Sequence, residues 1–395
     1  MHDRTMANTK KILTTHVGSL IRPPALKEFI AKKQGGLPYD KQAYEATLRD
    51  SVAEVVAQQA RTGIDIPSDG EFGKGISWSQ YVLDRLSGFT RRAAKPGEHG
   101  FARGADRARF ADFYKELDAA DGPPAAVGAT AGIAVCTGPV KYTGQAELQR
   151  DIDNFKAALA SAGGKQGFLP VAAPASVIPD RVNEHYKSDE DLLVAIAEAM
   201  RTEYRAIVDA GLFVQLDDAR LAVTYDRMVP PKSFDEYKRW VGRQVDLINH
   251  ALEGIPQERV RYHVCWGSWP GPHTTDVPLK SIVDEIVKVR AGTYLIEGAN
   301  PRHEHEWQVW KEVDFPKDRI LGLGVISHAT NVVEHPELVA ERLTRVARIL
   351  GPERVVASTD CGFAQGPFHR RVHPSVMWAK LESLVEGAKL ASAAL

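Results

Sequence analysis

Residues 320–358 read ILGLGVISHATNVVEHPELVAERLTRVARILGPERVVAS. The stretch opens with an apolar run at 320–326 and closes with a second one at 355–358. Between the two runs, apolar residues recur at spacings of three and four, which places them on one face of a helix. These residues are Leu338, Val339, Leu343, Val346 and Leu350. The order strand, helix, strand predicts two parallel strands joined by a covering helix.

The same alternation continues along most of the chain. Short apolar runs that are typical of strands lie at 12–17, 64–67, 168–173, 212–216, 260–265, 293–297, 320–326 and 355–358. Eight such runs, alternating with helical segments over nearly 400 residues, predict an α/β protein. They favour a (β/α)8 TIM barrel over an open doubly wound sheet.

A ninth strand candidate lies at 135–142, so one candidate must lie outside the barrel. A Gly/Ala-rich run precedes it, and we expect a hairpin within 125–142. Residues 91–124 are basic and then polar, with a Gly-Pro-Pro break that is typical of an insertion. The sequence therefore predicts one catalytic barrel domain over 1–395, with an insertion and hairpin region at 91–142.

Composition and charge exclude several classes of protein. Of the 395 residues, 44% are hydrophobic, and 50 Lys and Arg balance 51 Asp and Glu. Such a chain can bury a large core, and it lacks the positive charge of a nucleic-acid binder. No apolar stretch reaches the roughly 20 residues of a membrane span, and the polar start lacks a signal-peptide core. Three Cys make no disulfide framework, so we expect a cytoplasmic protein.

The most informative segment is 261–267, Arg-Tyr-His-Val-Cys-Trp-Gly. His263 and Cys265 are two residues apart on a predicted strand, so they face the same way. They lie at its carboxyl end, where barrel enzymes keep their active sites. Imidazole and thiolate both bind zinc, but zinc sites usually use three or four protein ligands. A half-buried strand end without metal is the alternative.

Two further strand ends carry ligand types. Glu297 follows one apolar run directly, and Cys361 follows the last one. Because a barrel closes its strands into a ring, successive strand ends converge. The sequence therefore predicts a four-ligand zinc site, in which a substrate displaces one ligand, made of His263, Cys265, Glu297 and Cys361. The alternatives are a buried Cys that acts as a small hydrophobe and a Glu that caps the next helix.

Residues 301–306, Pro-Arg-His-Glu-His-Glu, offer a competing set of ligands. However, Asn300 followed by Pro301 predicts the start of a helix, and acidic residues are favoured in a first turn. His303 and His305 would then point in different directions. We expect this segment to contact substrate or to support the ligands rather than to bind metal itself.

Carboxylates and backbone amides stand at other strand ends. Asp69 and Glu71, and also Asp217 and Asp218, suit a cationic group such as a substrate ammonium. Pairing with nearby Arg is the alternative. The segment 14–19, Thr-Thr-His-Val-Gly-Ser, brings amides and a hydroxyl that can hold a carboxylate, although a simple turn explains its glycine equally well.

With these residues in place, the chain resembles the cobalamin-independent methionine synthase family, in its catalytic C-terminal barrel. The resemblance runs from about residue 11 to 386 and is strongest over 262–363. It implies a fold similar to uroporphyrinogen decarboxylase and one catalytic zinc on His263, Cys265, Glu297 and Cys361. It implies that homocysteine is held through its carboxylate by Val17, Gly18 and Ser19, and through its ammonium group by Glu71 and Asp217.

The chain also departs from the family pattern. Full-length members carry a second, N-terminal barrel, for which 395 residues leave no room. Their folate-contacting Glu corresponds to Val223, and their stacking Trp is missing after the Gly-Pro-Val motif at 138–140. The family's proton-donating His is matched only one position away, by His328. A short relative, epoxyalkane–coenzyme M transferase, implies that such barrels can alkylate other thiols.

We therefore expect a zinc-dependent methyl- or alkyltransferase acting on a small thiol of the homocysteine type, as in methionine biosynthesis, with a donor other than ordinary methylfolate. Metal coordination deprotonates a thiol, whose sulfur then displaces the leaving group. His328 is the candidate proton donor. Three alternatives are alkylation of a thiol such as coenzyme M, a metal-dependent hydrolase, and a binding module with structural zinc or no metal. We expect no nucleic-acid or membrane partner, and a homo-oligomer is compatible with the sequence.

Overall fold

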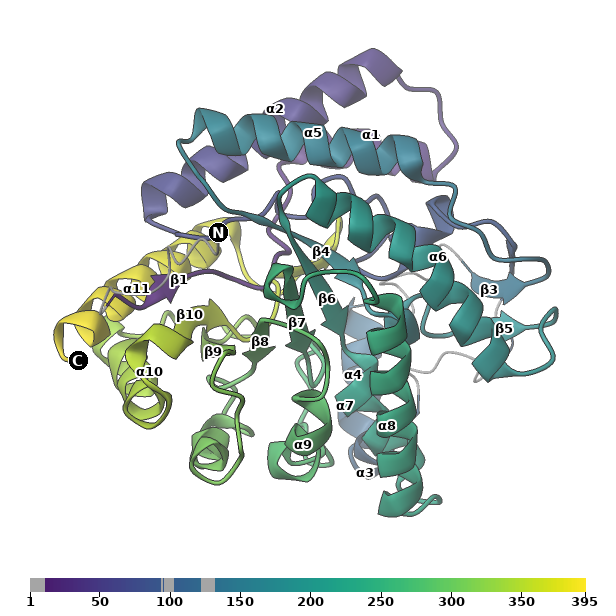
Figure 1. Cartoon of the computed structure of the whole chain (residues 1–395). Coiled ribbons are helices and arrows are strands. Elements are labelled where there is room, and N and C mark those ends of the chain that lie inside the picture. The colour runs from purple at the N-terminus through teal and green to yellow at the C-terminus, as the bar shows by residue number, and fades with distance from the viewer. Residues whose placement is uncertain (1–10, 94, 96–102, 122–131) are drawn as a thin grey trace.

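The structure, a computed structural model, describes residues 11–93, 95, 103–121 and 132–395. A curled parallel sheet of seven strands occupies the centre of the molecule (Figure 1). In spatial order its strands are β1 (Leu13–Thr14), β10 (Val355–Thr359), β9 (Ile320–Ile326), β8 (Thr293–Ile296), β7 (Val260–Val264), β6 (Phe213–Asp218) and β4 (Phe168–Ala172). Every neighbouring pair in this sheet is parallel.

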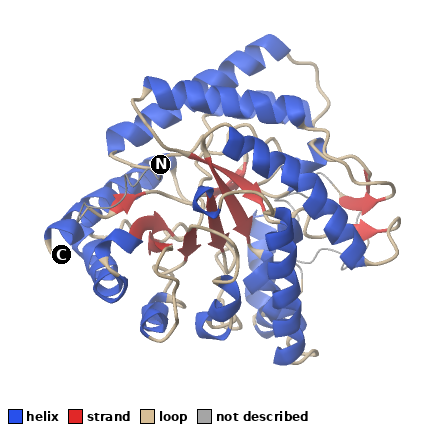
Figure 2. Ribbon diagram, in the orientation of Figure 1, coloured by secondary structure: helices blue, strands red, loops and turns tan. Residues whose placement is uncertain are grey.

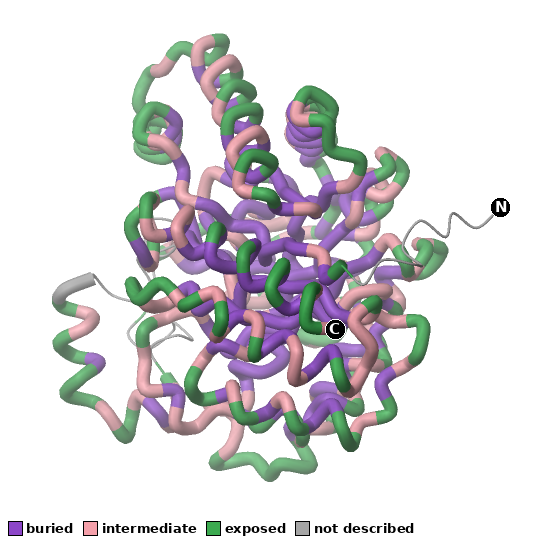
Figure 3. Tube along the Cα trace, turned by 90° about the vertical axis from the view of Figure 1, so that its left-hand side faces the viewer, coloured by how far each residue is buried: buried purple, intermediate pink, exposed green. Residues whose placement is uncertain are grey.

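The strands are buried along most of their length, as is typical of a parallel sheet that is covered on both faces. All residues of β4, β7 and β10 are buried. Figure 3 shows this buried core running through the middle of the chain trace. The near-continuous apolar runs in the sequence therefore reflect burial on two sides rather than on one.

Helices surround the strands (Figure 2). They are α1 (Pro24–Gln34), α2 (Lys41–Thr62), α5 (Gln145–Ser161), α6 (Asp189–Asp209), α7 (Arg220–Met228), α8 (Phe234–Ala251), α9 (Val283–Ile286), α10 (Pro336–Leu350) and α11 (Pro374–Ala393). In α10 the buried side chains include Val339, Leu343 and Val346, the face expected from the sequence. That face packs against β9, β10 and α11. Burying each such side chain stabilises the fold by about 1.5–3 kcal/mol.

The expected strand at 64–67 is not a regular strand. Ile66 makes one bridge to Thr15, and Ser68 makes one to Phe168, so this segment links the two edges of the sheet through single bridges. Pro67 has no backbone N–H to give to a ladder. The backbone N–H and C=O of Ser68 bond instead to the side chain of Gln59, at 3.0 and 2.8 Å. The observed sheet thus has seven regular strands and a break where the sequence predicts an eighth.

The ninth strand candidate lies outside this sheet. It forms β3 (Ile133–Cys136), which pairs antiparallel with β2 (Phe89–Arg92) and parallel with β5 (Val182–Asn183). The strand ends at 136, before the Gly-Pro pair at 138–139, and therefore does not extend to 142 as expected. Its partner comes from 89–92 and not from within 125–142, and residues 122–131 of that expected hairpin lie outside the described residues.

Shorter elements complete the region around the carboxyl ends of the strands. Between β2 and β3 lie two helices, α3 (Ala105–Arg109) and α4 (Ala111–Asp121). After β10 the chain forms a small hairpin of β11 (Ala364–Gly366) and β12 (His369–Arg370). In the described part of the chain, no helix combines the length and apolar character that crossing a membrane requires.

Candidate functional site

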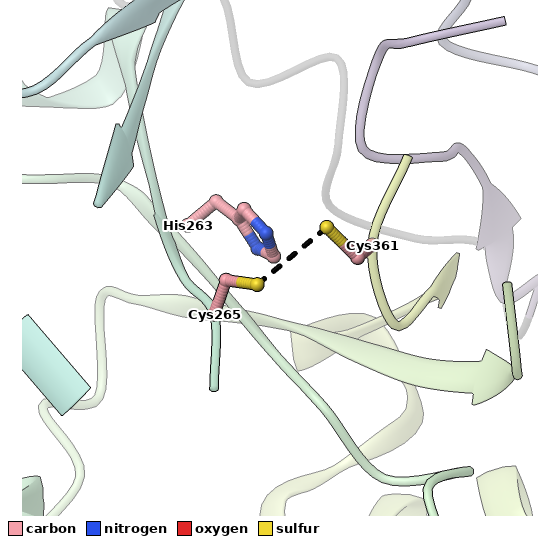
Figure 4. Close-up of side chains that lie close together, drawn as sticks. All are labelled: His263, Cys265 and Cys361. Atoms are coloured by element: carbon pink, nitrogen blue, oxygen red, sulfur yellow. Dashed lines mark hydrogen bonds between the residues drawn. The ribbon is translucent and has the colours of Figure 1, made fainter. Parts of the chain in front are cut away.

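Three of the four predicted metal ligands meet at the carboxyl ends of the strands (Figure 4). His263 lies in β7, Cys265 follows that strand directly, and Cys361 follows β10 by two residues. One ligand atom from each residue lies within 4.8 Å of the other two. The two sulfur atoms are 3.6 Å apart. The strand ends thus converge here as the sequence predicts.

The chain turns sharply just after Cys265. Gly267 has a φ of +100°, and a Cβ on it would lie 1.8 Å from the ring of Trp269. Its N–H donates to the Sγ of Cys265 at 3.1 Å. A backbone donor of this kind favours the thiolate over the thiol. The turn therefore both aims Cys265 into the cluster and stabilises its charged form.

Glu297 lies at the neighbouring strand end but does not join this cluster of described residues. Its Oε1 accepts a hydrogen bond from the backbone N–H of Trp266 at 3.0 Å. Its Oε2 accepts one from the amide of Asn300 at 3.2 Å. Burial raises the pKa of Glu297, while the charge of His303 opposes that shift. The structure thus places Glu297 beside the cluster with both oxygens already engaged.

The residues of the cluster fit a bound divalent ion. Within the described residues, neither ring nitrogen of buried His263 has a hydrogen-bond partner. Burial lowers the pKa of His263 to about 3, which a weak contact with the Leu295 backbone offsets only in part, so the ring is neutral. The hydrogen bond to Cys361, followed by burial, raises the pKa of Cys265 well above its usual range.

Without a cation, a thiolate on buried Cys265 beside the sulfur of half-buried Cys361 is therefore strongly disfavoured. A bound ion would satisfy the imidazole nitrogen and allow both thiols to ionise. Two sulfurs and one nitrogen are a donor set that suits zinc.

A cavity of about 500 Å³ opens over the cluster. The predicted site residues that line it are Val17, Ser19, Glu71, Asp217, His263, Cys265 and Cys361. Gly18 lies beneath this lining with a φ of +128°. A Cβ there would meet the ring of Pro170 at 2.5 Å, so only glycine fits. One cavity thus gathers seven of the ten site residues that the sequence predicts, while Gly18, Glu297 and His328 do not line it.

The amides predicted to hold a carboxylate have internal partners in this structure. The N–H of Val17 donates to the hydroxyl of Thr359 at 3.3 Å, and that of Gly18 donates to Nδ1 of His16 at 3.0 Å. The hydroxyl of Ser19 donates to the carbonyl of Ala364. A ligand carboxylate would have to exchange some of these bonds, so this role stays a prediction.

The acidic strand ends divide into two kinds. Asp69 accepts from the N–H of Glu71, and Asp218 accepts from Tyr262 and from the first turn of α7, so both serve the local fold. Asp217 and Glu71 face the cavity instead. Burial, followed by the charge of Glu71, raises the pKa of Asp217 well above its usual range.

The expected alternative, pairing with Arg, is not seen for Glu71, which pairs with Lys74 at 3.1 Å. A buried carboxyl group whose pKa is raised by a neighbouring carboxylate, as that of Asp217 is by Glu71, is suited to a cationic ligand. Their role in binding an ammonium group stays a prediction.

His328 is buried and does not line the cavity. Burial, then the charge of Arg371, lowers its pKa to about 3. Neither ring nitrogen has a hydrogen-bond partner among the described residues. The neutral ring has no acidic proton to give at neutral pH, so its role as proton donor stays a prediction.

Residues 301–306 adopt turns and then the 3-10 helix η8 (Glu304–Lys311), so no helix begins at Pro301 as expected. His303 is buried and His305 is exposed, so the two point in different directions as expected. Burial alone would lower the pKa of His303, but hydrogen bonds to Asp276 and Glu306 at 3.0 and 2.8 Å raise it to about 10. The segment thus places a buried positive charge near Glu297.

Several residues that line the cavity were not singled out from the sequence. Trp78 supplies aromatic surface from another loop, although the stacking Trp expected after 138–140 is missing. Arg220 and Arg227 lie on α7, one turn before and after Val223. The spacing of these three residues on the helix that follows a strand-end carboxylate is a signal that could have found them.

A curled parallel sheet, with His and Cys side chains that could hold a metal ion at the carboxyl ends of its strands, defines an α/β protein with a candidate active site. Residues 171–389 match the family described as "Cobalamin-independent synthase, Catalytic domain". Because this match covers more than half of the chain, the protein belongs to that family, and the resemblance drawn from 262–363 is confirmed.

The chain is similar to two curated enzymes over most of their length. It is 25% identical to the methionine synthase of Sulfolobus acidocaldarius over 352 residues, which cover 88% of this chain and 85% of the relative. It is 24% identical to the 2-hydroxypropyl-CoM lyase of Xanthobacter autotrophicus over 380 residues, which cover 89% and 87%.

Among solved structures, the fold matches a B12-independent methionine synthase from Shewanella sp. W3-18-1 in complex with selenomethionine. The TM-score is 0.71 at 19% identity, over 96% of this chain and 97% of that one. A second match, from Listeria monocytogenes, has a TM-score of 0.64, also at 19% identity, and covers 97% and 98%. These likenesses confirm a methionine synthase-like α/β fold.

Proposed function

We propose that this enzyme transfers a methyl or alkyl group to the sulfur of a small thiol at a zinc ion held by His263, Cys265 and Cys361. The observation that carries the proposal is the meeting of these three ligand types within 4.8 Å, in the lining of one cavity. Membership in the cobalamin-independent synthase family supports it. Glu297 is the proposed fourth ligand, since its charge already acts on Cys265.

The chemistry follows from the donor set. When bound, zinc supplies the positive charge that keeps a substrate thiol deprotonated at neutral pH. Cys265 and Cys361 balance that charge, while neutral His263 adds none. The thiol sulfur then forms a bond to the donor's carbon as the bond from that carbon to its leaving group breaks.

The other residues of the cavity position the acceptor. Glu71 and Asp217 would hold its ammonium group, and Val17, Gly18 and Ser19 its carboxylate, which favours homocysteine. His328 is retained as the proposed proton donor to the leaving group. Because burial keeps its ring neutral, a bound anionic group would first have to raise its pKa.

The proposal also covers the closure of the sheet, the extent of the domain and the cellular location. We interpret the curled sheet as a (β/α)8 barrel whose second position is 64–68, an interpretation supported by the two single bridges. We take 1–395 as one catalytic domain. Three free cysteines are compatible with a cytoplasmic enzyme, whose partners are a small thiol and an alkyl donor.

A second candidate is alkylation of a thiol that is not an amino acid, such as coenzyme M. The similarity to 2-hydroxypropyl-CoM lyase favours it specifically. A metal-dependent hydrolase fits less well, because hydrolytic zinc sites commonly use His and carboxylate ligands and this cluster has two Cys. The acidic pair Glu71 and Asp217 distinguishes the two thiol classes, since only an amino-acid thiol carries an ammonium group.

The test is a product screen on zinc-replete protein. Homocysteine and coenzyme M are each incubated with a panel of donors that includes methylfolates, methylcobalamin, aryl methyl ethers and epoxides. Mass spectrometry should detect one S-alkylated thiol that H263A and C361A fail to form. Zinc-replete protein that retains no metal, or a product formed equally well by both variants, would contradict the proposal.

A further inference from the structure

One wall of the cavity is basic, and the proposed reaction makes no use of it. Arg220, Val223 and Arg227 line the cavity from α7. They are separated by three and four residues, so they share one face of the helix. Two cationic side chains therefore flank an apolar one on a surface that faces the same space as the metal cluster.

Arg220 is short of partners in its own chain. Its Nη1 is out of contact with solvent and has no hydrogen-bond partner among the described residues. Within that part of the chain, Arg220 also forms no ion pair inside 4.0 Å. A buried guanidinium nitrogen without a hydrogen-bond partner raises the free energy of the folded protein. A ligand that accepts a hydrogen bond from this nitrogen removes that penalty and binds more tightly for it.

The charges of Asp180 and Asp218 act on Arg220, and Asp180 also lines the cavity. Two carboxylates, one on α7 and one at its entry, are already committed. Asp218 accepts hydrogen bonds from Tyr262, Ser176 and the first backbone N–H groups of α7. Asp226 accepts from the N–H of Asp106 at 2.9 Å and from the hydroxyl of Thr275. Neither is free to turn toward the guanidinium of Arg220.

The cations also act on one another. Burial, followed by the charge of Arg220, lowers the pKa of Arg227 to about 9. Burial and then Arg220 likewise lower the pKa of Arg181 to about 10. Clustered cations that destabilise each other's charged forms are stabilised by an anion placed among them.

From this geometry we infer that Arg220 and Arg227 form a subsite for an anionic group, such as a carboxylate, sulfonate or phosphate, on a substrate that reacts at the metal cluster. The inference rests on the proposed function. A guanidinium offers two parallel N–H donors that match the oxygens of such a group, and Val223 contacts the apolar part that carries it. The cavity thus has an acidic side at Glu71 and Asp217 and a basic side on α7.

The anion can belong to the thiol or to the donor, and matched probes separate these sources. Isothermal titration on the zinc-replete full chain compares coenzyme M with 2-mercaptoethanol, which lacks only the sulfonate. A second arm compares benzoate with benzamide and adds inorganic phosphate, none of which has a thiol. The variants are R220Q and R227Q, and the control is R239Q, which removes the charge of an exposed arginine on α8.

In at least one arm, the wild type should bind the anion more tightly than its neutral partner, and R220Q should weaken anion binding roughly 10- to 100-fold. R239Q should change nothing. A preference confined to coenzyme M places the anion on the thiol, and a preference for benzoate or phosphate places it on the donor. If the anions bind no better than the neutral probes in both arms, or if R220Q and R227Q bind anions as the wild type does, the inference is overturned.

A separate measurement distinguishes failure of the proposed metal-centred function from failure of the anion subsite. In cobalt-substituted protein, Cys265 and Cys361 already give sulfur-to-cobalt absorption, so coordination of an added thiol appears as a further sulfur-to-cobalt band during the titration. If that band forms with both thiols but no anion preference exists, the metal-centred function stands and the anion subsite falls. If the band never forms while R220Q still weakens anion binding, the reverse holds. Far-UV circular dichroism confirms that each variant is folded.

Discussion

The sulfur atoms of Cys265 and Cys361 lie 3.6 Å apart although two other strands separate β7 from β10 in the sheet. Adjacent strands are spaced by about 4.8 Å, so a flat sheet would hold these strand ends about 14 Å apart. Curling of the sheet closes that distance. The metal cluster is therefore a product of the curvature and is as sensitive to it as to the ligands themselves.

Metal content should follow the three clustered residues. H263A, C265A and C361A each remove one of the donor atoms, and we expect each to lower bound zinc from about one ion per chain to nearly none. E297A should retain more zinc than these three, because Glu297 is engaged by Trp266 and Asn300.

Elemental analysis after dialysis measures the zinc bound by each variant. C136A, a buried free cysteine in β3, is the control and should keep its zinc. Equal zinc in C136A and C361A would show that the cluster is not the metal site.

Loss of the acidic pair should weaken an amino-acid thiol. E71Q and D217N each remove a buried carboxylate from the cavity, and we expect each to cost about 1.5–3 kcal/mol of homocysteine binding. Zinc content should stay the same. The control ligand is a propyl thiol, which has no ammonium group and should bind all three proteins alike. Unchanged homocysteine affinity in both variants would rule out the ammonium site.

Methyltetrahydrofolate should be a poor donor. Val223 replaces the family's folate-contacting Glu and lines the cavity, so a polar group of the folate would face an apolar side chain. An unsatisfied polar group costs about 1–3 kcal/mol. Trp78 and Trp269 do supply stacking surface, so the prediction now rests on Val223. Methionine formation at about 1 s⁻¹ or faster, at micromolar folate, would refute it.

The stability contributed by His303 should depend on pH. Hydrogen bonds to Asp276 and Glu306 outweigh burial and raise its pKa to about 10, from an ordinary value of 6.5. A raised pKa means that this stabilisation is complete below about 6.5 and is lost as the pH rises through 10.

H303Q should therefore have its largest loss of unfolding free energy near pH 6, with the loss shrinking toward pH 10. Urea titrations of metal-free protein across this range measure it. H185Q, at an exposed histidine, gives the baseline. A difference between wild type and H303Q that stays constant with pH would disprove the charged state of His303.

A buried ion pair should hold the loop that carries His328. Lys380, fully buried on α11, lies 2.8 Å from Glu334, whose other oxygen accepts from the N–H of Ser327. K380M leaves that carboxylate buried without its partner, which should cost about 3–5 kcal/mol of unfolding free energy.

The matched control is K389M, which breaks an exposed pair on the same helix and should cost less than about 1 kcal/mol. Chemical denaturation compares the two variants. Similar losses for K380M and K389M would show that burial of the pair contributes nothing.

The local sequence pattern was sufficient to predict most of the strands and three residues of the candidate site. Seven apolar runs became parallel strands, and His263, Cys265 and Cys361 met because each follows or ends such a run. What failed depended on distant partners. The run at 64–67 makes only a single bridge, and the backbone groups of the next residue, Ser68, bond to the side chain of Gln59, a contact that no periodicity reveals.

The sequence pattern also could not predict which partner a given side chain or strand contacts. Nothing in the residues around Glu297 shows that its carboxylate accepts a hydrogen bond from the backbone N–H of Trp266, at a different strand end. The strand partner of 133–136 lies some 40 residues earlier in the chain, beyond any hairpin signal. The arginines of α7 were overlooked because a helical spacing shows which residues share a face, but not which cavity that face meets.

The break at 64–68 gives the two parts of the candidate site, the His263, Cys265 and Cys361 cluster and the acidic residue Glu71, supports of different stability. The metal cluster sits on strands joined by continuous ladders, whereas Glu71 follows the segment held by single bridges. Few backbone hydrogen bonds must break to loosen residues 64–68, so this segment has a lower local stability than the strands of the sheet. Amide exchange there should run ahead of exchange in β7–β10. The segment that leads to Glu71 should therefore move more readily than the strand ends that carry His263, Cys265 and Cys361.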